Sequence, residues 1–133
     1  MNLHLEILVE EPSLKESLLK LLPKILSQET TLVINRIVVE ELEAWFFGDP
    51  VALHHAYPKL PQSLTQKARY RIPDQIAGGT WEALEQELQR VGYFMGGLPK
   101  IEVAKTVSQY MEPQRNSSAS FQLFYQTLLE LKI

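Results

Sequence analysis

The sequence predicts an α/β protein in which a strand–helix–strand unit is followed by a mainly helical half. Three observations favour this fold class: apolar and polar residues alternate in residues 2–10, leucines recur at helical spacing in residues 12–27, and β-branched residues dominate residues 30–39. Two strands joined through a helix form a βαβ unit, which normally makes a right-handed crossover between parallel strands. The length of 133 residues suits a single domain.

The first helix carries start and stop signals in the sequence. Pro12 and Ser13 mark its beginning, and Glu16 follows Ser13 at the three-residue spacing of a capping box. Pro23 lies inside the helical pattern. It is expected to kink or end the helix nearby, because proline lacks the amide hydrogen that a helix interior needs.

The predicted sheet has two strands, one in residues 2–10 and one in residues 30–39. A two-stranded parallel sheet is poorly stable by itself, since parallel sheets need cover on both faces and neighbours at their edges. Exposed edges also invite pairing with another chain. The sequence therefore predicts a homo-oligomer, most simply a two-fold dimer.

The C-terminal half is predicted to contain five helical segments and one irregular stretch. The irregular stretch, residues 58–79, holds three prolines and two adjacent glycines, which favour turns over regular structure. Thr80 is placed to cap the third helical segment, and Trp45, Phe46 and Trp81 are expected in the core. The five segments are residues 40–47, 50–57, 80–92, 99–111 and 118–132.

The composition excludes several classes of protein. The net charge of -3 gives no bulk attraction to nucleic acid, and the absence of cysteine excludes a disulfide framework and a thiolate metal site. The N-terminal residues lack the basic region of a signal peptide. No apolar run approaches the ~18 residues that span a bilayer. We therefore expect a cytoplasmic protein with no membrane partner.

The densest positive segment is KARYR, which contains Lys67, Arg69 and Arg71. Three clustered cations can contact phosphate with weak, salt-sensitive affinity, or they can belong to an ordinary solvated loop. Both interpretations remain open, and nucleic acid is the candidate partner for the first.

Long segments of the chain resemble the Toprim-like family catalogued as domain of unknown function 4276. Residues 7–23, ILVEEPSLKESLLKLLP, are similar to the family's first strand and helix. Residues 34–50, 67–113 and 115–131 are similar to its C-terminal part and contain the motifs EELEAWFFGDP and RNSSASF. The resemblance covers nearly all of the chain, and it implies a Toprim-like partial parallel sheet.

The resemblance also implies a magnesium site for phosphodiester chemistry. Toprim-type sites hold Mg²⁺ through carboxylates at adjacent strand ends, where the metal orients and neutralises a phosphodiester. Glu10 matches the acidic residue after the family's first strand, and Glu41 and Glu43 lie in the matching EELEAW motif. The family's Asp-rich segment is missing after residue 28, which implies a shortened form. Glu10, Glu41 and Glu43 are then the expected catalytic and metal-binding residues.

The candidate residues also have structural interpretations. Glutamates at a helix start are stabilised by the helix dipole, by about 0.3–1 kcal/mol each, so Glu41 and Glu43 can be capping charges. Lys100 and Arg115 can bind phosphate near the backbone amides at Ser117–Ser118. Alternatively, these two cations form a cap and a surface salt bridge.

Two functions remain open. The first is a metal-dependent, nuclease-like protein that holds Mg²⁺ with the three glutamates and contacts phosphate with Lys67, Arg69, Lys100 and Arg115. The second is a non-catalytic, shortened homologue that serves as an oligomerising or partner-binding module. The missing Asp-rich segment favours the second function, whereas the retained motifs are equally expected for a kept site and for a kept fold.

Overall fold

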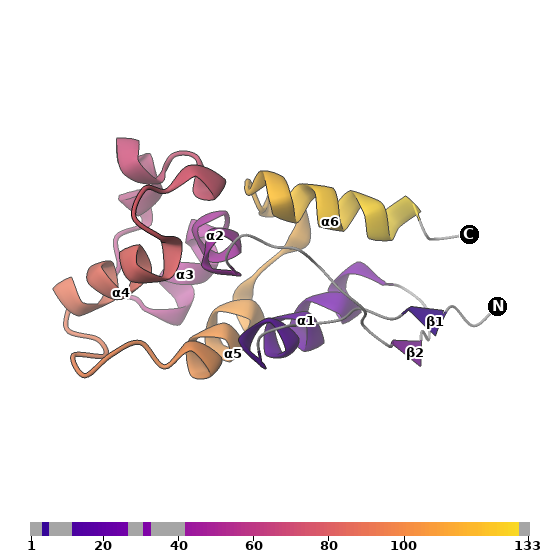
Figure 1. Ribbon diagram of the computed structural model, residues 1–133, viewed down its shortest axis with the longest axis horizontal. Coiled ribbons are helices and arrows are strands. Elements are labelled where there is room, and N and C mark those ends of the chain that lie inside the picture. Colours follow the sequence, from indigo (N-terminus) through magenta and orange to yellow (C-terminus); the bar gives the residue numbers. More distant parts are fainter. Residues whose placement is uncertain (1–3, 6–11, 27–30, 33–41, 131–133) are drawn as a thin grey trace.

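Helices make up most of the described part of the chain (Figure 1). The computed structural model describes residues 4–5, 12–26, 31–32 and 42–130. The α-helices are α1 (Pro12–Ile25), α2 (Leu42–Phe47), α3 (Pro50–Ala56), α4 (Thr80–Arg90), α5 (Lys100–Tyr110) and α6 (Ala119–Glu130). Short 3₁₀ segments connect them: η1 (Gln62–Gln66), η2 (Ala68–Tyr70), η3 (Pro73–Gln75) and η4 (Pro113–Arg115).

The predicted fold class, an α/β protein with a Toprim-like partial parallel sheet, is wrong. Within the described residues, strand pairing is limited to β1 (His4–Leu5) and β2 (Thr31–Leu32), which run parallel with His4 opposite Thr31. Two residues per strand offer too little apolar surface to carry a core. The described hydrophobic core is instead formed by helices and the turns between them. The other residues of the two predicted strands lie outside the described part.

The helices α1 and α5 lie side by side at the base of the molecule (Figure 1). The leucines of α1 that were expected on one stripe are buried, and Leu18 and Leu21 have no exposed surface. Where the helices meet, the Ser108 hydroxyl donates to the Ser17 hydroxyl at 2.7 Å, which satisfies both buried groups. The ammonium of Lys24 also donates to backbone carbonyls at the end of α5.

The short helix α2 lies in the centre of the core, and all six of its residues are buried. Apart from Glu43 the residues of α2 are apolar, so the helix needs neighbours on most sides, and it has α3, α4, η3 and the aromatic side of α6 around it. The Trp45 ring packs edge-on against Phe121 at 5.0 Å and stacks with Phe124 at 5.1 Å. The prediction that Trp45 and Phe46 belong to the core is confirmed.

Helix boundaries follow the predicted signals with small differences. α1 ends two residues after Pro23, as the proline suggested. The predicted cap of α4 is wrong by one position, because Gly79 is the N-cap and Thr80 is the first helical residue. Trp81 is only half-buried, so its placement in the core is also wrong. Residues 58–79, predicted to be irregular, contain three short 3₁₀ segments.

Candidate phosphate-binding face and buried polar network

The glutamates predicted to bind metal are only partly covered by the structure. Glu10 and Glu41 lie outside the described residues. Glu43 lies in α2 and is buried, with 4% of its surface exposed. Among the residues that are described, no three His, Asp or Glu side chains come together in a way that could hold a metal ion. The predicted magnesium site therefore stays a prediction.

Arg115, predicted to contact phosphate, binds a carboxylate of its own chain. Its Nε donates to Asp49 Oδ1 at 2.7 Å, and its Nη2 donates to Asp49 Oδ2 at 3.1 Å. The same Nη2 also donates to the Tyr110 carbonyl at 2.8 Å. This bidentate geometry is the strong form of an arginine–carboxylate pair. The guanidinium is therefore already occupied, as the structural interpretation of Arg115 supposed, although its partner is fully buried and not at the surface.

Asp49 is the centre of this contact, and it has three kinds of partner. It has no exposed surface. Besides binding Arg115, its Oδ1 caps α3 by accepting from the Ala52 amide at 3.1 Å, and its Oδ2 accepts from the Glu112 amide at 3.0 Å. The sequence contained a signal for the cap, since Asp49 directly precedes a proline at the first helical position. Asp49 and Arg115 are 66 residues apart in the sequence, and no sequence signal predicted their contact.

A second polar cluster begins at Asn116, directly after Arg115. The Asn116 amide donates to the Trp45 carbonyl at 2.8 Å, and its Oδ1 accepts from the Ser118 amide at 2.9 Å. Asp74 then accepts from the Ser118 hydroxyl and from the Ser120 amide, each at 2.6 Å. The motif RNSSASF therefore connects α2, η3 and the start of α6. We call these contacts, together with those of Asp49, the buried polar network.

Gly48 lets the two parts of the buried polar network approach each other. A Cβ atom at position 48 would lie 2.1 Å from Asn116 Oδ1 and 2.8 Å from the Ser118 amide nitrogen. The Gly48 carbonyl accepts from the Ser117 amide at 2.8 Å. The motif FFGDP therefore ends α2 and also packs against residues 116–118.

Lys100, a second predicted phosphate contact, covers an aromatic ring. Its ammonium lies 4.7 Å from the centre of the Trp81 ring, within the range of a cation–π interaction. An open depression of about 600 Å³ begins beside it and is lined by Pro99, Lys100, Ile101, Glu102 and Lys105. Lys100 was predicted to bind phosphate together with Arg115. It instead contacts Trp81 on α4, and none of the described contacts joins Lys100 to Arg115.

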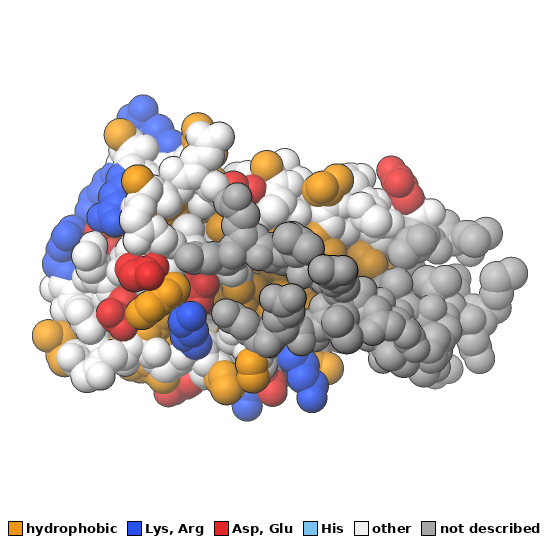
Figure 2. Space-filling model, viewed as in Figure 1, with side chains coloured by type: hydrophobic (Ala, Val, Ile, Leu, Met, Phe, Trp, Pro, Cys, Tyr) orange, Lys and Arg blue, Asp and Glu red, His pale blue; other side chains and the backbone are white. Residues whose placement is uncertain are grey.

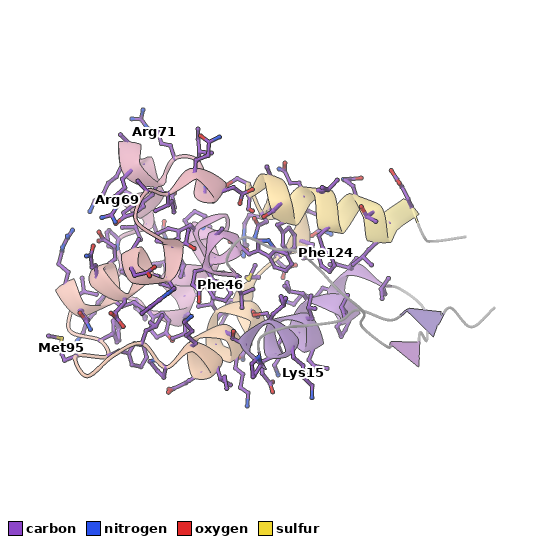
Figure 3. The ribbon with its side chains drawn as sticks, in the orientation of Figure 1. Lys15, Phe46, Arg69, Arg71, Met95 and Phe124 are labelled. Atoms are coloured by element: carbon purple, nitrogen blue, oxygen red, sulfur yellow. The ribbon has the colours of Figure 1, made fainter. Side chains whose placement is uncertain are left out.

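The remaining predicted phosphate contacts, Lys67 and Arg69, lie on one exposed surface with Arg71 and Arg90. Figure 2 shows lysine and arginine side chains gathered along one edge of the molecule, and Figure 3 places Arg69 and Arg71 there. All four residues are exposed. We call Lys67, Arg69, Arg71 and Arg90 the basic face. Sequence analysis missed Arg90, because it lies on α4 and far from the KARYR segment in sequence.

One buried carboxylate connects the basic face to the core. Glu87 lies on α4 and 5% of its side chain is exposed. Its carboxylate lies 3.6 Å from the Lys67 ammonium and 3.2 Å from Arg90 Nη1. It also accepts from the Tyr70 hydroxyl at 2.8 Å. When Glu87 is counted with the four cations, the basic face has a formal charge of +3, whereas the net charge of the chain is -3.

Tyr70 forms the floor of the basic face. Its ring is 1% exposed and stacks on Phe47 at 4.9 Å, while the Arg69 guanidinium lies 5.3 Å from the ring centre. Burial, together with the hydrogen bond to Glu87, raises the pKa of Tyr70 to about 12. The phenol therefore stays neutral at physiological pH and keeps donating to Glu87.

Comparison with protein families gives one match. The profile described as Domain of unknown function (DUF4276) matches residues 25–129, which include α2 to α5, the basic face and the buried polar network. No curated protein and no solved structure gave a match.

Proposed function

Since the chain belongs to the family described as Domain of unknown function (DUF4276), we propose its function from its own residues: it is a partner-binding module that contacts the phosphate backbone of nucleic acid through the basic face. The observation that carries this proposal is the exposure of Lys67, Arg69, Arg71 and Arg90 on one edge of the molecule (Figure 2), where Lys67 and Arg90 share Glu87 and Arg69 binds the neighbouring Gln86. Clustered lysine and arginine on one face is the electrostatic footprint of nucleic-acid binding.

The geometry of the basic face supports phosphate binding better than the other predicted contacts do. Arg69 and Arg71 are bonded to neutral groups, the Gln86 side chain at 3.4 Å and the Gln66 carbonyl at 3.1 Å, and within the described part of the chain neither forms an ion pair. Arg115, in contrast, is neutralised by Asp49. A face of this size is expected to bind nucleic acid weakly, with a Kd of about 10⁻⁴–10⁻⁶ M at physiological salt.

The test is the binding of a fluorescently labelled nucleic acid, followed by anisotropy at low salt. The variant removes two charges of the basic face, Arg69→Gln with Arg71→Gln. The control removes two exposed charges of α1, Lys15→Gln with Lys20→Gln; Lys15 lies at the base of the view in Figure 3, away from Arg69 and Arg71. We expect only the first pair to weaken binding. Equal loss in both variants, or no binding by the unaltered protein, would overturn the proposal.

Metal-dependent phosphodiester processing is the second candidate, and it rests on the resemblance and not on the described contacts. The missing Asp-rich segment, and the shortened form inferred from it, weigh against this candidate. Calorimetric titration with Mn²⁺ and Mg²⁺ tests it: saturable binding that is weakened by Glu10→Gln would support a surviving carboxylate site. Absence of heat up to millimolar metal would contradict it.

The predicted homo-oligomer and cytoplasmic location stay predictions. The dimer was inferred from an incomplete sheet, and light scattering at micromolar concentration measures it directly. A monomeric mass would contradict the dimer. Among the helices that the structure describes, none is long and apolar enough to cross a membrane.

A further inference from the structure

We infer that the basic face binds duplex nucleic acid through its backbone alone, in preference to single strands and without reading base sequence. This inference rests on the proposed function and narrows it to one class of ligand. It follows from three features of the face: a covered aromatic ring, cations that each have a contact partner, and the distance to the partly exposed ring of Trp81 on α4.

The first feature concerns base stacking, which single-strand binders use. Unstacked bases bind by lying against exposed aromatic rings, at about 1–3 kcal/mol for each base. The aromatic ring beneath the basic face is that of Tyr70, which stacks on Phe47 and lies 5.3 Å from the Arg69 guanidinium. Because only 1% of the residue is exposed, this ring cannot accept a base.

The second feature is that each exposed cation has a contact partner. Glu87 holds Lys67 and Arg90, the Gln86 side chain holds Arg69, and the Gln66 carbonyl holds Arg71. Lys67, Arg69 and Arg71 lie in or directly beside the 3₁₀ segments η1 and η2, which are anchored in the core by Leu64 and Tyr70, and Arg90 is the last residue of α4.

Four exposed cations on one face complement a ligand whose charges are closely spaced. A duplex carries one phosphate charge per about 1.7 Å of axis, twice the density of one of its strands. Each phosphate bound on a duplex also releases more counterions, with a salt slope of about 0.9 against about 0.7 for a single strand. The higher charge density and the larger counterion release both favour binding of the duplex when base stacking contributes nothing.

The third feature is the position of the nearest partly exposed ring on the same helix. Trp81 lies at the first turn of α4, whereas Glu87 and Arg90 lie in its second half. Nine residues of helix separate Trp81 from Arg90, which is about 13 Å along the axis. One side of the Trp81 ring is also covered by Lys100. A strand on the basic face would therefore not stack on Trp81.

The experiment compares four labelled probes of equal length by anisotropy between about 50 and 200 mM salt. Two are duplexes of unrelated sequence, and two are single strands taken from them. We expect each duplex to bind roughly three- to tenfold more tightly than its strand, and the two duplexes to agree within about twofold. Arg69→Gln with Arg71→Gln should lower the salt slope for duplex by about 1.8, which is the loss of two phosphate contacts.

The outcomes separate this inference from the proposed function. Tighter binding of single strands, or a strong preference between the two duplexes, would overturn the inference while leaving nucleic-acid binding intact. Absence of binding to all four probes would overturn both. A Trp81→Leu variant gives an independent reading: unchanged affinity for single strands is expected, and a clear loss would show that Trp81 stacks on bases after all.

Discussion

The carboxylate of Asp49 accepts from Ala52, Glu112 and Arg115, and its removal is the most severe single change that we predict. Asp49→Ala leaves the Arg115 guanidinium without its carboxylate and removes the cap of α3. Because the Arg115 side chain is 35% exposed and can regain water, we expect a loss, with the cap included, of about 2–4 kcal/mol of unfolding free energy. Urea denaturation measures this loss. A loss below about 1 kcal/mol, the value of an exposed pair, would show that Asp49 is not buried in solution.

Neutralising Glu87 would make the basic face more positive without introducing another cation. Glu87→Gln keeps an acceptor for the Tyr70 hydroxyl but removes the negative charge between Lys67 and Arg90. The formal charge of the face rises from +3 to +4, so we expect tighter duplex binding and a salt slope larger by about 0.9. Circular dichroism checks that the variant is folded. Weaker binding by a folded variant would mean that Glu87 contributes to binding by ordering the cations.

At the scale of elements, Gly48 determines how closely the end of α2 approaches the chain before α6. Gly48→Ala would place a methyl group against Asn116 and Ser118, so we expect a loss of about 1–3 kcal/mol of unfolding free energy, as in other overpacked sites. Gly96→Ala is the matched control, because nothing lies within 4 Å of a Cβ at that position. Thermal unfolding of the two variants makes the comparison. Equal melting temperatures would contradict the close contact.

The helices could be predicted from sequence because their signals are local. α1, α4, α5 and α6 each show apolar residues at helical spacing, and the structure confirms all four. The sheet was not predictable in the same way. A β-branched apolar run indicates that a strand can form, but whether a sheet carries the core depends on partners distant in sequence.

The candidate site shows the same limit. Lys67, Arg69 and Arg71 were visible as a cluster because they are close in sequence, whereas Arg90 joins them only through the fold. Arg115 was singled out by a motif, and that motif proved to contact Asp49. A sequence motif therefore does not show whether its residues bind a ligand or contact each other, and the structure is needed to tell the two apart.

At the scale of the whole molecule, two buried tyrosines predict how stability changes in alkali. Burial raises the pKa of Tyr57 and of Tyr70 from 10.0 to about 12 each. Because the unfolded chain ionises first, their contribution is complete below pH 10 and is lost as pH rises toward 12. Urea denaturation across this range should show falling stability, and Tyr70→Phe should make the fall shallower. The same slope in the variant would contradict the predicted pKa of Tyr70.

The buried polar network has a consequence for how this chain is made. The ribosome releases residues 42–49 long before residues 115–121, yet the two stretches complete each other through Asp49, Asn116 and Trp45. Non-local contacts of this kind slow folding. Until α6 has been synthesised, α2 lacks the ring partners that cover Trp45, and Asp49 lacks its arginine. The nascent chain therefore presents an apolar helix with an unpaired acid beside it, which is the kind of surface that chaperones bind.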